Sequence, residues 1–344
     1  MRFRTLFQTT RPSFLILSPV CVFLGASTAL AQQGSVSAGL LTLVVIGALC
    51  AHVSVNMLNE YADFKSGLDL LTVKTPFSGG SGALPADPAT AWMVLATGAV
   101  TLFITFAIGI YFVSSHGAPI LVMGGAGIAI ILTYTRWINR WPLFCLIAPG
   151  LGFGILMVAG THYVLTGSLS TASWLAALVV FFLVNNLLLL NQFPDIEADR
   201  RIGRNHLPIA HGTRLGSLVF GVFSGLAYLT IVAGIHYGQF PPLSLAAIVP
   251  AALSLFAFTG AWRQGDRIGQ NPQYLGANVA ATFLPVDRPV RVGIQVALAA
   301  ASAALVLTFY MHLLSETMST YLLLGCTGFL MVAMLGLVLV SRRS

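Results

Sequence analysis

The chain has 344 residues, of which 57% are hydrophobic and only 8% are charged, and its mean hydropathy is +0.87. A soluble domain carries about 25% charged residues, so this composition excludes a water-soluble globular protein and indicates an integral membrane protein. The formal net charge of +7 could suggest a nucleic-acid partner. The positions of the basic residues argue against that partner, as described below.

Ten apolar stretches are each close to the roughly 20 residues that a helix needs to cross a bilayer. They lie at residues 12–31, 36–57, 91–114, 118–135, 143–166, 172–193, 215–237, 241–262, 290–311 and 320–341. Runs such as LAALVVFFLVNNLLLL are continuous, whereas barrel strands alternate in character over about ten residues. We therefore predict an all-α fold: a polytopic bundle of nine or ten transmembrane helices that forms a single domain over residues 1–344.

The 17 Lys and Arg residues lie at the two ends of the chain and in, or at the edge of, alternate connections between the stretches. This pattern follows the positive-inside rule. It predicts a multi-pass protein of the cell (inner) membrane with both termini in the cytoplasm. The positive net charge then follows from membrane topology, so we predict no nucleic-acid partner. The first stretch also has the shape of a cleavable secretory signal, but its near-spanning length favours a retained helix.

Two acidic segments follow the second and sixth apolar stretches, NEYADFKSGLD at 59–69 and NQFPDIEADR at 191–200. Asn59 and Asp63 are four residues apart, so one helical turn places both side chains on the same face. Asn191, Asp195 and Asp199 repeat this spacing. The two segments are expected on the same side of the membrane, where they would face each other.

Carboxylates gathered this closely repel one another unless a cation neutralises them, and magnesium prefers such hard oxygen ligands. A solvated helix end would explain either segment alone, but two matched segments at equal depth favour a metal–diphosphate site. The candidate Mg2+ ligands are Asn59, Asp63, Asp69, Asn191, Asp195 and Asp199, of which Asp63, Asp195 and Asp199 are also the candidate catalytic residues. Nearby basic residues are candidate diphosphate ligands, with membrane anchoring as the alternative: Lys65, Lys74, Arg136, Arg140, Arg200 and Arg204.

At these residues the chain resembles the UbiA superfamily of membrane aromatic prenyltransferases, which carry an NDxxDxxxD-like first motif and a DxxxD second motif. The phrase PDIEADRRIGR at 194–204 is similar to the branch that prenylates 1,4-dihydroxy-2-naphthoate in menaquinone synthesis. The resemblance covers a core of about 11–311, beyond which 320–341 would be an extra helix. The chain departs from the family pattern at Glu60, where the usual residue is Asp, and at Ile138, where other members have the lysine of a YxxxK element.

The resemblance implies a helical bundle around a central cavity that opens to lipid, with the active site on the cytoplasmic side. It implies Mg2+ as cofactor and polyprenyl diphosphate, an aromatic acceptor and the lipid bilayer as partners. The expected acceptor is 1,4-dihydroxy-2-naphthoate, with hydroxybenzoate, a homogentisate-like ring or a tetrapyrrole as alternatives. Ionisation of the diphosphate would leave a carbocation, which the rings of Tyr61, Phe64 and Tyr134 are candidates to stabilise by cation–π attraction; membrane-interface aromatics are the alternative for each.

A polytopic transporter is the main alternative from another functional class. Transporters usually place ionisable groups near the bilayer midplane, on broken helices. The interiors of the ten apolar stretches contain no Asp, Glu, Lys or Arg. The sequence therefore favours chemistry at the membrane interface.

Overall fold

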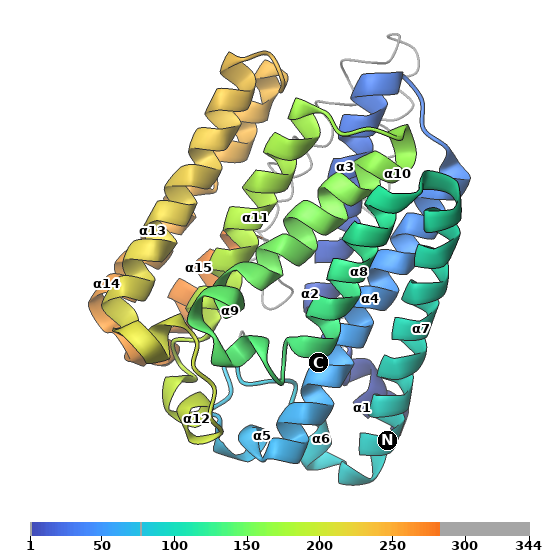
Figure 1. Cartoon of the computed structure of the whole chain (residues 1–344). Helices are drawn as coiled ribbons and strands as arrows, with labels where there is room; N and C mark the ends of the chain where they lie inside the picture. The colour runs from blue at the N-terminus through green and yellow to red at the C-terminus, as the bar shows by residue number, and fades with distance from the viewer. Residues whose placement is uncertain (1, 76–77, 283–344) are drawn as a thin grey trace, which may run out of the picture.

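The structure, a computed structural model, describes residues 2–75 and 78–282, in which every regular element is a helix (Figure 1). Six helical stretches in this part are long and apolar enough to cross a membrane: Pro12–Gln33, Ala38–Ser66, Pro88–His116, Pro142–Thr166, Thr171–Asn191 and Leu207–His236. The predicted all-α, multi-pass fold is thereby confirmed. The expected spans 290–311 and 320–341 lie outside the described residues, so the single-domain boundary of 1–344 stays a prediction.

The described α-helices are α1 (Arg2–Thr9), α2 (Pro12–Leu15), α3 (Leu17–Gln33), α4 (Ala38–Ser66), α5 (Leu68–Leu71), α6 (Ala83–Ala86), α7 (Ala91–His116), α8 (Ala118–Thr133), α9 (Pro142–Gly150), α10 (Gly160–Thr166), α11 (Thr171–Asn191), α12 (Ile196–Arg201), α13 (Leu207–His236), α14 (Ala251–Gln264) and α15 (Pro272–Thr282). A π-helix, η3 (Leu151–Ala159), joins α9 to α10. Short 3₁₀ turns cover Pro88–Thr90, Ile138–Arg140, Pro242–Ile248 and Gly265–Gln270.

The bundle has a middle layer formed by α3, α9 to α10 and α11, with α4, α7 and α8 on one side and α13 to α15 on the other (Figure 1). Its main apolar core joins the middle layer to α13 and α15, and includes Leu24, Val158, Leu187, Phe220 and Leu275. The short helices α1, α5, α6 and α12 gather at one end of the bundle, at the bottom of Figure 1. We call this the basic end because it carries the Lys- and Arg-containing connections.

The last two turns of helix α4 carry Asn59, Glu60 and Asp63 of the first acidic segment. The helix begins after Ser37, whose side chain accepts a hydrogen bond from the Leu40 amide at 3.3 Å. It ends at Gly67, which adopts a left-handed conformation with φ 77°, the usual way in which glycine stops a helix. Asn59 and Asp63 therefore share one helical face, as the spacing predicts.

The expected span 241–262 is not a single helix. The structure breaks it into the 3₁₀ turn Pro242–Ile248 and the 14-residue helix α14. Proline lacks a backbone N–H and clashes with the preceding turn, so Pro250, in the interior of the expected span, prevents one continuous helix. This segment accordingly falls outside the six helices with spanning length.

Glycines bring the π-helix against α11. The Gly150 amide donates to Asn185 Oδ1 at 2.6 Å, and a Cβ added at Gly154 would lie 2.5 Å from the backbone oxygen of Ala177. Small residues four positions apart allow two membrane helices to approach closely. This contact fixes η3, whose opposite face carries Gly152 and Phe153 and lines the cavity described next.

Candidate active site

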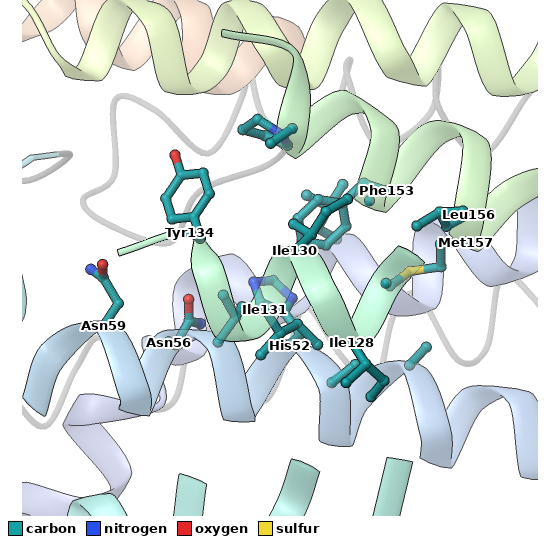
Figure 2. A pocket seen from close by; sticks show the side chains of 18 of the residues that line it. His52, Asn56, Asn59, Ile128, Ile130, Ile131, Tyr134, Phe153, Leu156 and Met157 are labelled. Atoms are coloured by element: carbon teal, nitrogen blue, oxygen red, sulfur yellow. The ribbon is translucent and has the colours of Figure 1, made fainter. Parts of the chain in front are cut away.

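A cavity of about 590 Å³ lies among α3, α4, α8 and η3. His52, Asn56 and Asn59 of α4 point into it, opposite Ile130, Ile131 and Phe153 (Figure 2). Phe106, Ile110 and Leu121 line the cavity and are also about half exposed. The cavity thus reaches the apolar outer surface between α7 and α8, while most of its polar lining is at the basic end.

All six candidate Mg2+ ligands line this one cavity. Asn59 and Asp63 come from α4 and Asp69 from α5, whereas the second segment supplies residues from the end of α11 and from α12. The structure therefore brings together two segments that are more than 120 residues apart in the sequence. Their role as metal ligands stays a prediction.

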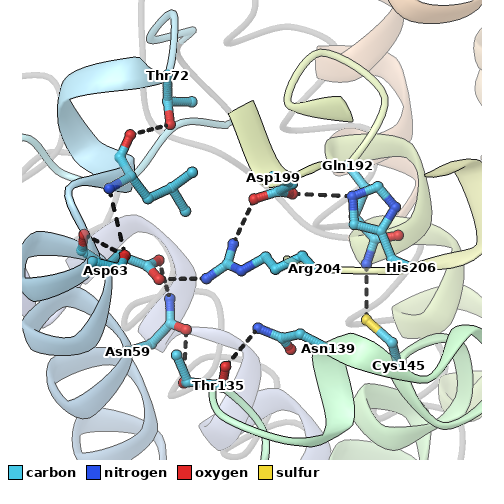
Figure 3. Close-up of polar contacts among 12 residues, drawn as sticks. Asn59, Asp63, Thr72, Thr135, Asn139, Cys145, Gln192, Asp199, Arg204 and His206 are labelled. Atoms are coloured by element: carbon cyan, nitrogen blue, oxygen red, sulfur yellow. Dashed lines mark hydrogen bonds and ion pairs between the residues drawn. The ribbon is translucent and has the colours of Figure 1, made fainter. Parts of the chain in front are cut away.

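Arg204 joins the two segments directly (Figure 3). Its Nη1 donates to Asp199 Oδ1 at 2.8 Å, and its Nη2 forms an ion pair with Asp63 Oδ1. His206 Nε2 lies 3.0 Å from the other oxygen of Asp199. Asn59 Nδ2 donates to Asp63 Oδ2 at 3.0 Å. The carboxylates are thereby oriented from both sides of the cavity.

The carboxyl groups of Asp195 and Asp69 have raised pKa values. Burial, reinforced by the nearby Asp199 charge, raises the pKa of Asp195 to about 7. Burial, reinforced by Glu60, raises the pKa of Asp69 to about 6. Arg11 and Arg204 oppose both shifts without cancelling them. A shift of this kind is expected where acidic groups repel one another in a poorly solvated place.

The oxygen atoms of the acidic segments fit the ligand preference of a magnesium ion. Three buried oxygens have no hydrogen-bond partner, namely Asp69 Oδ2, Asn191 Oδ1 and Asp195 Oδ1, although buried acceptors are normally paired. In residues 2–75 and 78–282, no group of three or more His, Cys, Asp or Glu side chains is arranged to hold a metal. The three unpaired oxygens, two from carboxylates and one from an amide, suit an ion that takes one or two protein carboxylates and completes its shell with water and phosphate oxygens.

The candidate diphosphate ligands are divided by the structure. Arg204 lines the cavity, whereas Lys74 is exposed and does not line it, although its charge lowers the pKa of Asp69. The others are exposed and do not line the cavity: Lys65, Arg136, Arg140 and Arg200. Lys65 Nζ lies 5.8 Å from the centre of the Tyr61 ring, and Arg200 pairs with Glu197 at 3.3 Å. A direct contact of these four with a ligand in the cavity is not supported.

The aromatic candidates are divided in the same way. Tyr134 lines the cavity. Tyr61 and Phe64 pack instead against Met57 and Leu84 in a separate apolar cluster. Only Tyr134 of the three is placed where its ring can face a ligand in the cavity.

Arg11, Asn139 and His206 line the cavity but were not among the candidate site residues from the sequence. Asn139 follows Ile138, the position of the family's lysine, and the 3₁₀ turn over Ile138–Arg140 buries Asn139 while it exposes Arg140. No spacing rule distinguishes these neighbours in advance. Arg11 is a basic residue at the start of an apolar stretch, a pattern that topology alone explains.

Comparison with known proteins identifies the family of the chain. The model of the UbiA prenyltransferase family matches residues 18–281. The 1,4-dihydroxy-2-naphthoate octaprenyltransferase of Bacillus subtilis (strain 168) is 28% identical over 241 residues, which cover 69% of this chain and 75% of that protein.

Two solved structures share the fold. A UbiA homologue from Aeropyrum pernix K1 matches with a TM-score of 0.58 at 19% identity, covering 82% of this chain and 96% of the other. A UbiA homologue from Archaeoglobus fulgidus, bound to GPP and Mg2+, matches with a TM-score of 0.52 at 14% identity, covering 89% and 98%. The chain is a prenyltransferase enzyme and belongs to the UbiA prenyltransferase family.

Proposed function

We propose that this enzyme transfers a polyprenyl group from an allylic polyprenyl diphosphate to 1,4-dihydroxy-2-naphthoate in a Mg2+-dependent reaction. The observation that carries the proposal is the meeting of the two acidic segments at one end of an apolar cavity, where Arg204 contacts both. A prenyl diphosphate has the same division, with an apolar chain at one end and a strongly anionic group at the other.

Asn59, Asp63, Asp69, Asn191, Asp195 and Asp199 would hold Mg2+. When bound, the metal supplies Lewis-acid stabilisation of the charge that develops on the diphosphate. The homologue from Archaeoglobus fulgidus binds GPP together with Mg2+, which supports this cofactor here. Arg204 contributes a fixed guanidinium beside the same carboxylates, where it can donate to phosphate oxygens.

The apolar part of the cavity would hold the prenyl chain and keep water away from the reacting carbon. The allylic C–O bond breaks and diphosphate leaves with the electron pair. The Tyr134 ring can stabilise the resulting cation, an effect of about 0.5–2 kcal/mol. An electron-rich carbon of the acceptor then forms the new C–C bond, and the ring loses a proton to regain its aromaticity.

Dihydroxynaphthoate is favoured as acceptor by the motif at 194–204 and by the activity named for the Bacillus subtilis relative. The test is an assay of purified protein in lipid nanodiscs with a polyprenyl diphosphate and Mg2+. Each nanodisc sample receives 1,4-dihydroxy-2-naphthoate, 4-hydroxybenzoate, homogentisate or no acceptor. Diphosphate release and the prenylated product, identified by mass spectrometry, are the readouts.

The expected result is a prenylated naphthoate product that is lost when EDTA removes the metal. A product on hydroxybenzoate or homogentisate alone would overturn the choice of acceptor and keep the reaction class. If no acceptor gives a product and no diphosphate is released, the proposed reaction itself fails. The variant Asp63→Asn should release no diphosphate with any acceptor.

A further inference from the structure

The bend between α1 and α2 holds Arg11 in a strained backbone conformation. Arg11 has φ 54° and ψ 64°, and it is the one non-glycine residue with positive φ among those that the structure describes. Pro12 follows directly, and proline disfavours the right-handed helical region for the residue before it. A left-handed conformation is costly for a residue with a side chain, and it persists only where the surroundings impose it.

Side chains of α4 and α6 to α7 impose this bend. Asn56 Nδ2 of α4 donates to the backbone oxygen of Thr10 at 2.9 Å. Thr5 Oγ1 of α1 donates to Asp87 Oδ2 at 3.0 Å. The Nε of Arg11 lies 3.5 Å from Glu60 Oε1. As a result the Arg11 side chain, which is 27% exposed, is directed to the basic end of the cavity and lines it.

Glu60 occupies the motif position that differs from the family pattern, and it does not line the cavity. Its side chain is only 2% exposed. One carboxylate oxygen accepts from the Ser81 amide at 2.8 Å, and the other accepts from Ser81 Oγ at 2.6 Å. Glu60 therefore connects α4 to two segments, the bend at Arg11 and the glycine-rich loop 78–82. Gly79 and Gly80 of this loop line the cavity.

We propose that Arg11 binds the diphosphate of the substrate, and that Glu60 is a positioning residue for Arg11 and Ser81 that takes no metal ion. This inference rests on the proposed function. In the described part of the chain, the terminal nitrogens of Arg11 donate no hydrogen bond to another residue, whereas those of Arg204 are both engaged by carboxylates. A guanidinium with free terminal nitrogens, fixed beside a cavity, suits two-pronged contact with an anion.

Arg11→Gly separates the binding role from a structural one, because glycine adopts positive φ without strain. The probe is inorganic pyrophosphate with Mg2+, titrated calorimetrically into the full-length protein in detergent. Arg11→Gly should raise the Kd about 10-fold to 100-fold, the usual effect of losing hydrogen bonds to a charged group, without lowering the melting temperature. Arg4→Ala, which removes an exposed cation from α1, is the control and should bind pyrophosphate like the unmodified protein.

Glu60→Gln tests the positioning role. It should raise the pyrophosphate Kd by roughly threefold to tenfold, since Arg11 would lose its charged partner. Mn2+ binding without pyrophosphate, measured by electron paramagnetic resonance, should stay unchanged in Glu60→Gln and fall in Asp63→Asn.

Three outcomes would overturn the inference. Equal pyrophosphate affinity in Arg11→Gly and the unmodified protein would remove Arg11 from the binding site. Loss of Mn2+ binding in Glu60→Gln would make Glu60 a metal ligand. If the unmodified protein binds no pyrophosphate in the presence of Mg2+, the proposed function fails and the inference fails with it.

Discussion

Arg204 contacts both acidic segments, and it does so while largely buried. Taking charges out of water is costly, and the cost is offset only when partners and hydrogen bonds are well placed. Asp199 meets this condition by accepting from Arg204 on one oxygen and from His206 on the other. The position of Arg204 thus depends on residues from both halves of the site.

Arg204→Lys tests this bridging role. Lysine keeps the positive charge but concentrates it at one point, so it cannot contact Asp63 and Asp199 with two fixed donors at once. We expect kcat/KM for prenyl transfer to fall about 10-fold to 100-fold, the effect of losing one charged hydrogen bond. Arg200→Lys, at an exposed position, is the matched control and should leave kcat/KM unchanged. Full activity in Arg204→Lys would contradict the bridging role.

The acidity of Asp195 predicts a pH dependence of metal binding. Its pKa of about 7, raised by burial and by Asp199, means that the free protein holds a proton there below neutral pH. Metal ligands must be deprotonated, so binding releases this proton. The affinity for Mg2+ should therefore be constant above about pH 8 and fall by about tenfold for each pH unit below pH 7.

Mg2+ titrations of activity between about pH 5.5 and 8.5 measure this slope. Asp69 has a pKa of about 6, so the affinity for Mg2+ should fall more steeply with decreasing pH below about pH 6. Asp266→Asn, which removes an exposed carboxylate, should leave the slope as it is. A Mg2+ affinity that does not change over this range would show that neither Asp195 nor Asp69 binds the metal.

At the scale of elements, the contact of η3 with α11 sets one wall of the cavity. A Cβ at Gly154 would lie 2.5 Å from the Ala177 oxygen, whereas a Cβ at Gly152 would meet nothing within 4 Å. Gly154→Ala should therefore force the two helices apart and destabilise the protein by about 1–3 kcal/mol, as overpacking does. Gly152→Ala should be neutral or slightly stabilising, because alanine favours the helix.

Unfolding of the two variants in mixed micelles gives the comparison directly. Both changes add one methyl group to the same π-helix, so a difference between them reports the helix contact and not helix propensity. Equal stability of Gly154→Ala and Gly152→Ala would mean that η3 and α11 do not approach as closely as the structure has them.

Helix α8 leaves open space in the cavity where a long prenyl chain would lie. Gly124 and Gly125 line the cavity, and a Cβ at either would meet nothing within 4 Å. Gly124→Phe should fill this space and shift the preference toward shorter prenyl diphosphates, as measured by kcat/KM with donors of different length. Gly225→Phe, on α13 at an exposed position outside the cavity, is the control. An unchanged length preference in Gly124→Phe would place the chain elsewhere.

The sequence predicts elements well where one periodic signal dominates and poorly where local backbone geometry decides. Spacing alone placed Asn59 and Asp63 on one face, because residues four apart are neighbours on any helix. Spacing could not predict that Asn139 is buried and Arg140 exposed, because that depends on the 3₁₀ turn over Ile138–Arg140. It also treated Arg11 only as a topology signal, because the bend that directs Arg11 into the cavity arises from contacts with α4.

At the scale of the whole molecule, the polar end of the cavity and the basic connections coincide. The short helices α5 and α12, which carry Asp69 and Asp199, lie at this end (Figure 1). Arg11, Arg204 and both acidic segments line the same cavity. The opposite end holds short polar connections, including the one around Ser168, whose Oγ accepts a hydrogen bond from Gln32 at 3.0 Å. A water-soluble diphosphate group and a lipid-soluble chain would thus be kept at different depths of one cavity.

This arrangement predicts the orientation of the protein in the membrane. Basic connections stay on the cytoplasmic side, so Arg136 should face the cytoplasm and Ser168 should face outward. Single cysteines introduced as Arg136→Cys and Ser168→Cys, in a background with the four native cysteines replaced, report this through a membrane-impermeant maleimide. Ser168→Cys should be labelled in intact cells, and Arg136→Cys only after the membrane is opened. The reverse pattern would place the acidic segments outside, away from any diphosphate made in the cytoplasm, and the charge pattern would then need another explanation.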